Sequence, residues 1–164
     1  MLSVKIRHAT PDDLDGLSRI ENICFPQNEA APRDCQRDRL YVFPNHFWVM
    51  ENDAGEVIGY ANGMVVNQQT FSDEWFSDAD LHDENGDWQT VFGLTMLPEY
   101  QRRGYAGRLM EALIAAAREE NRKGCILTCK EHLVPYYEKF GYIKTGISPS
   151  KLGGATWYDM VLTF

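Results

Sequence analysis

The chain lacks the features that mark several common classes of protein. No apolar run is long enough to span a bilayer, which predicts no membrane partner. The content of 44% hydrophobic and 12% aromatic residues is typical of a globular domain rather than a disordered chain. The first residues, Met1 to Arg7, form a short strand pattern that is unlike a signal peptide. We therefore expect one domain over residues 1–164, located in the cytoplasm.

Cysteine and histidine are scarce, with four of each, and neither type shows metal-ligand spacing. Cys125 and Cys129 fall on one expected strand, roughly 13 Å apart at the usual rise, which is too far for a disulfide. Cys24 and Cys35 form no Cys-x-x-Cys pair. We expect buried free thiols in a reducing compartment, and no metal.

Positive charge is missing from the middle of the chain. Residues 41–101 contain no Lys or Arg but eleven Asp and Glu, whereas residues 102–164 contain ten basic and six acidic residues. No basic face is interleaved with aromatic residues, which disfavours nucleic-acid binding. The acidic loops aid solubility, and their segregation predicts that the middle third attracts cations.

The chain also lacks the two best-known phosphate loops, Gly-x-x-x-x-Gly-Lys-Ser/Thr and Gly-x-Gly-x-x-Gly. It has instead a basic turn at residues 101–107, between an apolar run at 91–96 and a helical run at 108–120. Free N–H groups and the helix dipole at such a helix start attract phosphate, and Gly104 and Gly107 permit close approach. The turn predicts a pyrophosphate site; the alternative is a surface turn with two solvated arginines.

The hydrophobic pattern predicts the order β-α-α-β-β-β-α-β-α-β-β, a mixed sheet with helices on both faces. Strands are expected at 3–8, 47–50, 57–66, 88–97, 124–129, 142–147 and 157–163, and helices at 10–24, 32–41, 104–121 and 134–140. Strands 88–97 and 124–129 with the long helix between them form one βαβ unit. The acidic stretch at 68–87 is expected to be a functional or mobile loop.

Two motifs resemble the hallmarks of the GNAT superfamily of acyl-CoA N-acyltransferases. They are the segment Gln101-Arg102-Arg103-Gly104-Tyr105-Ala106 and the aromatic segment 133–142 that ends in Phe-Gly-Tyr. The segments 24–31 and 129–135 resemble the arylalkylamine (serotonin-type) N-acetyltransferase branch. The resemblance extends over nearly the whole chain. It implies a single N-acetyltransferase domain of the α/β (α+β) class, with a mostly antiparallel sheet of about seven strands.

The resemblance implies an acyltransferase of class EC 2.3.1 that uses acetyl-CoA as co-substrate and no metal. Leu94, Thr95 and Met96 would offer backbone groups to the pantetheine arm, and the Met96 N–H would stabilise the oxyanion. The pyrophosphate would be held by Arg102, Arg103, Gly104, Tyr105, Ala106 and Gly107. Tyr137 would complete the cofactor site and protonate the leaving thiolate. Direct transfer is favoured, because Cys129 lacks an evident base partner for an acyl-enzyme.

The chain departs from the arylalkylamine branch at two positions. Thr90 and Phe92 stand where that branch carries a pair of proton-relaying histidines. Glu29 is the first candidate for the general base, because it lies in the matched Phe-Pro-x-x-Glu stretch. Weaker candidates are His82, Asp80 and Asp87. The residues expected to contact the substrate are Phe25, Pro26, Glu29 and Thr128.

The acceptor is the least determined part of this prediction. The acidic middle third, with aromatic residues, favours a small arylalkyl or polyamine-like amine. The aromatic residues expected near the acceptor are Phe25, Tyr41, Phe43, Phe71 and Trp75. Three alternatives stay open: acetylation of a protein or peptide amine, a non-catalytic acyl-CoA-binding module, and an unrelated nucleotide-binding α/β domain. A monomer and a homodimer paired through the C-terminal strands are both compatible with the sequence.

Overall fold

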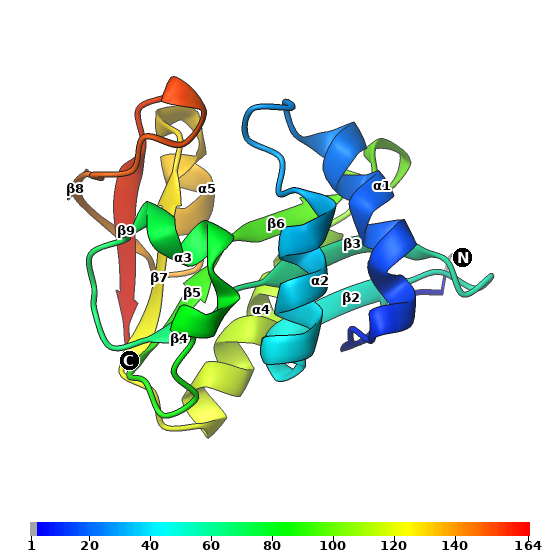
Figure 1. The fold of residues 1–164 in the computed structure, drawn as a ribbon, viewed down its shortest axis with the longest axis horizontal. Helices are drawn as coiled ribbons and strands as arrows, with labels where there is room; N and C mark the ends of the chain where they lie inside the picture. The colour runs from blue at the N-terminus through cyan, green and yellow to red at the C-terminus, as the bar shows by residue number, and fades with distance from the viewer. Residues whose placement is uncertain (1–2) are drawn as a thin grey trace.

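The computed structural model describes residues 3–164. Met1 and Leu2 lie outside the described residues; they begin the N-terminal segment that was considered above as a signal peptide. Figure 1 shows the elements, several of them joined by short 3-10 turns. In chain order they are β1 (Lys5–His8), α1 (Leu14–Cys24), α2 (Arg33–Val42), β2 (Phe47–Glu51), β3 (Val57–Asn62), β4 (Val65–Val66), α3 (Asp73–Ser77), β5 (Trp88–Val91), β6 (Gly93–Met96), α4 (Tyr105–Glu119), β7 (Gly124–Cys129), α5 (Val134–Glu138), β8 (Ile143–Ile147) and β9 (Tyr158–Thr163).

The strands form two sheets, in the orders β1-β2-β3-β6 and β4-β5-β7-β9-β8. All pairs are antiparallel except β5 with β7, which is parallel, as expected for the βαβ unit around α4. The mixed, mostly antiparallel fold is confirmed. The described residues form nine strands in two sheets rather than about seven in one, because two expected strands each break in two. At Gly63 a Cβ would lie 1.9 Å from the Thr90 carbonyl oxygen, so only glycine permits the chain between β3 and β4 to pass this close to β5. The second break is at Phe92.

Helices cover both faces of the first sheet, as the sequence predicts. Phe47 and Val49 on β2 share a buried cluster with Leu17 of α1 and Leu40 of α2. The alternate β2 residues, Trp48 and Met50, share another with α4. This alternation follows from the two-residue repeat of a strand.

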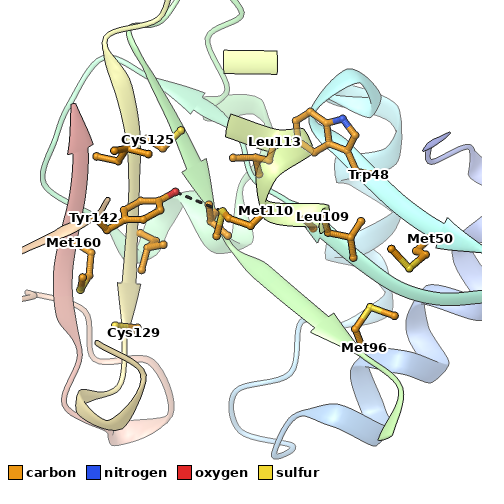
Figure 2. Close-up of a cluster of buried hydrophobic side chains, with 14 of the residues drawn as sticks. Trp48, Met50, Met96, Leu109, Met110, Leu113, Cys125, Cys129, Tyr142 and Met160 are labelled. Atoms are coloured by element: carbon orange, nitrogen blue, oxygen red, sulfur yellow. Dashed lines mark hydrogen bonds between the residues drawn. The ribbon is translucent and has the colours of Figure 1, made fainter. Parts of the chain in front are cut away.

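The long helix α4 fills the angle between the two sheets. Its residues Leu109, Met110 and Leu113 contact side chains of both sheets (Figure 2). The Tyr142 hydroxyl reaches the Met110 sulfur at 3.6 Å (Figure 2). Because α4 packs on both sheets, its N-terminus is held at the line along which they separate.

The acidic stretch at 68–87 is more ordered than a loop. It contains α3 and a 3-10 turn, and it covers one face of the second sheet. Phe71 and Trp75 are buried there against Trp88 and Ile126. The sequence pattern missed this helix because its apolar residues are too few for a helical repeat.

The cysteines match the sequence prediction in part. All four are free thiols, but only Cys125 and Cys129 are buried, whereas Cys24 and Cys35 are half-buried. Both lie in the cluster around α4 (Figure 2).

Candidate active site

The two sheets separate at Phe92. Up to Val91, strand β5 pairs with β7, whereas from Gly93 onward the same stretch of chain, now β6, pairs with β3. Strands β6 and β7 therefore diverge (Figure 1). Two cavities lie along this divergence.

The first cavity, here called the turn cavity, has a volume of about 560 Å³. Its walls come from β6, the basic turn, the start of α4 and the segment around α5. The second, the aromatic cavity, has a volume of about 260 Å³ and lies between the end of α1, β5–β6, the end of β7 and the chain before β9. The two cavities share Leu94, Leu133 and Tyr137, so they meet at these side chains.

The basic turn lines the turn cavity and has a set of unbonded backbone donors. Gly104 caps α4 with a left-handed φ of 80°, and Arg102 has a φ of 62°. Among the described residues, no acceptor is bonded to the N–H groups of 102–107, whereas Arg108 N–H already bonds the Gly104 carbonyl. The Gln101 side chain ties the turn to the Met96 carbonyl at 3.0 Å. Free donors at a helix start are suited to a phosphate.

Strand β6 also presents backbone groups to the opening. The bond from Leu97 N–H to the Ile58 carbonyl, 2.8 Å, sets the register in which alternate residues bond β3. In that register the backbone N–H and carbonyl of Thr95 point toward Tyr60 on β3. The backbone groups of Leu94 and Met96 point away from β3, toward the diverging side. The Leu94 groups and the Met96 N–H can pair with an extended ligand as a further strand would, whereas the Met96 carbonyl already accepts from Gln101 and Cys24.

Tyr137 stands where the two cavities meet. Its ring packs edge-on against Tyr136 and Tyr142, with centroid distances of 5.2 and 6.1 Å. Burial is the main cause that raises the pKa of Tyr137, and its neighbour Cys129 adds to the effect. Among the described residues, the Tyr137 hydroxyl has no hydrogen-bond partner. A neutral phenol at the junction can donate a proton to either cavity.

The family model described as Acetyltransferase (GNAT) family matches residues 14–142. The chain belongs to the GNAT family. No helix among residues 3–164 is both long enough and apolar enough to cross a membrane.

Two curated relatives share part of their length with this GNAT chain. The Probable hydrolase YhcX of Bacillus subtilis (strain 168) is 28% identical over 97% of this chain, which spans about a third (32%) of that relative's length. An uncharacterized N-acetyltransferase of Archaeoglobus fulgidus is 28% identical over 73% of this chain and 78% of its own.

Solved structures show the same GNAT fold. The loading GNATL domain of CurA from Lyngbya majuscula has a TM-score of 0.86 at 14% identity, covering 98% of each chain. The GphF GNAT-like decarboxylase in complex with isobutyryl-CoA has a TM-score of 0.79 at 20% identity, covering 97% of this chain and 98% of its own. At these identities the likeness is one of fold.

The GNAT chain brings its four expected substrate residues into one place: Phe25, Pro26, Glu29 and Thr128 all line the aromatic cavity. Of the other expected aromatic residues only Phe71 lines it. Phe43 and Trp75 are buried in the core, and Tyr41 is 68% exposed beside a separate small cavity. Their spacing in the sequence could not show which way each ring points.

The acidic middle third contributes aromatic side chains, and not carboxylates, to the described wall of the aromatic cavity. From the stretch 68–87 the cavity wall contains Phe71 and Phe76, and no carboxylate among the described residues. Asp73 instead accepts from the Ser150 hydroxyl and from Lys151 N–H. The two acids in the wall come from the N-terminal third, and they are Glu21 and Glu29.

Glu29 is held in an ion pair. Its carboxylate lies 2.9 Å from the Lys130 ammonium, with the two side chains 10% and 33% exposed. The Lys130 ammonium also lies 5.7 Å from the centre of the Trp157 ring. Next to this pair, the Asn28 side-chain amide donates to the Gly153 carbonyl at 3.1 Å. The loop after α1 thus contacts the chain before β9 across the cavity.

Glu21 is a buried acid that the sequence analysis did not select. It accepts the Tyr60 hydroxyl at 2.6 Å and the Ala31 N–H at 3.0 Å. Burial raises the pKa of Glu21, although both hydrogen bonds and nearby Arg39 oppose that shift. A sequence signal existed, since Glu21 falls four residues after Leu17 on the buried stripe of α1, where an acid is unusual.

The weaker candidates for the base lie outside the aromatic cavity. Asp80 lines the separate small cavity, and Asp87 pairs with Lys123 at 3.3 Å. At the two positions that replace the histidine pair, Phe92 lines the aromatic cavity, whereas the buried Thr90 hydroxyl donates to the Met64 carbonyl.

His82 belongs to a group with His46 and Glu84 whose ligand atoms lie within 4.8 Å of one another, as in a metal site. The His82 Nδ1 accepts the Val65 N–H at 2.9 Å, so its Nε2 carries the proton and donates to Glu84. Arg122 also pairs with Glu84 at 3.1 Å. A metal would need the lone pair of that His82 nitrogen, so the group is a hydrogen-bonded network.

Two thiols line the aromatic cavity without the features of a nucleophile. Burial raises the pKa of Cys129 to about 11. Burial also raises the pKa of Cys24, whose sulfur donates to the Met96 carbonyl at 3.3 Å. Both groups are thiols at neutral pH, and a thiol is a poor nucleophile.

Proposed function

We propose that this chain is an acetyl-CoA-dependent N-acetyltransferase that acetylates the primary amine of a small arylalkyl or polyamine-like molecule by direct attack. One observation carries the proposal. Tyr137 is shared by a cavity that ends in free backbone N–H groups and a cavity that is walled by aromatic rings. The first suits the donor and the second the acceptor, so the reacting groups would meet beside Tyr137.

The donor site is proposed from groups that fit coenzyme A. The N–H groups of 102–107 would bind the pyrophosphate, with Arg102 and Arg103 adding charge. The backbone groups of Leu94 and the Met96 N–H would face the pantetheine arm and its thioester. A Cβ on Gly104 would meet no atom within 4 Å, so the approach to this turn is open.

Tyr137 would supply the acid in the reaction. Acetyl-CoA brings an activated thioester, and the amine must attack as the free base. The raised pKa keeps Tyr137 protonated at pH 7, so its hydroxyl can protonate the departing thiolate. The Met96 N–H faces the same opening and is the proposed oxyanion donor.

The closed wall and small volume of the aromatic cavity support a small acceptor over a folded protein. The Asn28–Gly153 hydrogen bond and the Glu29–Lys130 pair join segments on opposite sides of it. Its volume, about 260 Å³, is just below the range of about 300–1,000 Å³ that is usual for small-molecule pockets. In this arrangement Glu29 is proposed to contact the amine; its assignment as general base stays a prediction.

The test is an acceptor panel with purified protein and acetyl-CoA. It comprises phenethylamine, tryptamine, spermidine, a peptide with a free N-terminus and a lysine peptide with a blocked one. Thiol release measures turnover, and mass spectrometry of each acceptor confirms the acetyl group. We expect turnover of the small amines and little of the peptides. Turnover of a peptide alone would replace the small-amine proposal with a protein acceptor.

The same assay separates two other functions. A binding module would take up CoA, measured by calorimetry, yet release no thiol with any acceptor. Because one structurally similar protein is described as a decarboxylase, malonyl-CoA without amine is included, and loss of its carboxylate is followed by mass. Decarboxylation without amine transfer would contradict the proposed function.

A further inference from the structure

The wall of the aromatic cavity contains two carboxylates, and among the described residues only one of them forms an ion pair. Glu29 is paired with Lys130 at 2.9 Å, which offsets its charge. Glu21 has no Lys, Arg or His within ion-pair distance among the described residues. Of the two, Glu21 is therefore the better proton acceptor.

Glu21 reaches the junction of the cavities through Tyr60. The Tyr60 hydroxyl lies 2.6 Å from the Glu21 carboxylate. The same hydroxyl lies only 2.7 Å from the position that a Cβ on Gly93 would occupy. Gly93 precedes Leu94, which lines both cavities. The pair is thus directly beneath the strand that would present its backbone to the thioester.

The surroundings of Glu21 are built to keep a buried carboxylate in place. From α2, the Arg39 guanidinium is 2% exposed, lies over Phe76 and Phe92 at 4.7 and 4.8 Å, and is bonded to the Phe76 carbonyl. Arg39 acts on Glu21 as a nearby charge and also fixes two rings of the cavity wall. The other titratable groups facing Glu21 are Tyr60 from β3 and Cys24 from α1.

We infer that Glu21, in place of the Glu29 predicted from the sequence, is the general base of the transfer, taking the proton that the amine nitrogen loses as its bond to the acetyl carbon forms. This inference rests on the proposed function. In the step, the carbon–nitrogen bond forms and the carbon–sulfur bond breaks. Glu21 gains the proton from nitrogen, and Tyr137 gives its proton to sulfur. Exchange with solvent then returns one proton to Tyr137 and removes one from Glu21, so the balance closes.

The acid branch of the pH–rate profile is the signature of this role. Burial raises the pKa of Glu21, so its carboxylate is lost at a higher pH than for an exposed glutamate. Activity should fall as the pH drops through that raised value, because a protonated Glu21 cannot accept a proton.

The experiment compares three variants with the wild type over a range of pH, using an amine that the panel identifies. Glu21→Gln keeps the size of the side chain and can still bond Ala31 N–H and Tyr60. We expect kcat to fall by about 10²–10⁴, the acid branch to disappear and the affinity for CoA to stay the same. Glu29→Gln is the matched control, and it should keep the acid branch.

Tyr60→Phe tests the same carboxylate without removing it. The Tyr60 hydroxyl lowers the pKa of Glu21, so its loss should move the acid branch to higher pH. If thermal unfolding shows that Glu21→Gln does not fold, the pH–rate profile of Tyr60→Phe decides whether Glu21 is the base. The inference is overturned if the acid branch of Tyr60→Phe lies at the same pH as that of the wild type.

The outcomes separate the inference from the proposed function. If the wild type acetylates an amine while Glu21→Gln stays within about threefold of it, with an unchanged pH profile, only the inference fails. If the wild type acetylates no acceptor, the proposed function fails and the inference fails with it.

Discussion

The Lys130 ammonium lies 2.9 Å from the Glu29 carboxylate, a contact between residues 101 positions apart in the chain. It joins the loop after α1 to the end of β7, at the wall of the aromatic cavity. The pair makes this part of the wall neutral, although each partner alone would select for charge. Under the proposed function, Lys130 would limit how strongly Glu29 attracts a cationic amine.

Replacing Lys130 should expose that charge. In Lys130→Met the carboxylate of Glu29 is free to bind an ammonium group, so KM for a cationic amine should fall by about two- to tenfold. Steady-state kinetics at saturating acetyl-CoA measures the change. Lys151→Met removes an exposed lysine whose side chain makes no ion pair among the described residues, and it should leave KM unaltered. A KM that rises in Lys130→Met would contradict the role of the pair.

Tyr137→Phe should separate binding from chemistry. Loss of the phenol proton should lower kcat by about 10²–10⁴, with CoA affinity retained because the ring stays in the wall. Tyr136→Phe is the matched control: Tyr136 is on the same helix and lines the turn cavity but not the aromatic one. The prediction fails if both variants lose activity equally.

Gly104→Ala should weaken CoA binding at the turn. Gly104 has a φ of 80°, and a Cβ there meets nothing within 4 Å, so the cost of alanine is backbone strain of about 1–2 kcal/mol. Gly55, in the turn between β2 and β3, has a φ of 79° and equally open space. Gly55→Ala should cost similar stability and leave CoA affinity unchanged. Calorimetric titration with CoA, next to thermal unfolding, distinguishes the two effects.

The ion pair at the start of the first helical segment should make stability depend on acid pH. Arg7 contacts Asp13 through two nitrogens at 2.8 and 2.9 Å. Burial alone would raise the pKa of Asp13, but the bonds from Arg7 and the Thr10 N–H outweigh it, and the pKa is lowered. A lowered pKa means that this stabilisation is present above the unfolded value of about 3.9 and is lost as pH falls through the folded value.

Asp13→Asn should therefore lower the free energy of unfolding by about 1.5–3 kcal/mol at pH 7. The difference from the wild type should shrink below about pH 4. Urea unfolding at several pH values measures it. Asp12→Asn, a change at the exposed neighbouring residue, is the control. Equal losses in both variants would show that general charge, rather than the Arg7 contact, is responsible.

The local sequence pattern was sufficient to predict most of the helices and strands. The helix starting after Gly104, strand β7 and the parallel pairing of β5 with β7 follow from short-range signals: a glycine turn, an apolar run and a βαβ spacing. The breaks at Gly63 and Phe92 were not predictable, because each depends on which sheet the chain joins next. The gathering of Phe25, Pro26, Glu29 and Thr128 into one cavity wall agrees with the family resemblance, whereas composition alone suggested an acidic one.

What the sequence by itself determined is the basic turn, the proposed donor site, because such a turn is a local structure made by consecutive residues. The basic turn, the family and the element order were all available from neighbours in the chain. Only the tertiary structure decided the make-up of the aromatic cavity, the proposed acceptor site. There the wall combines α1, β5–β6, β7 and the chain before β9, so the partners of each charge are distant in sequence. The pairing of Glu29 with Lys130, and the burial of Glu21 beside Tyr60, exist only once the two sheets have folded against their helices.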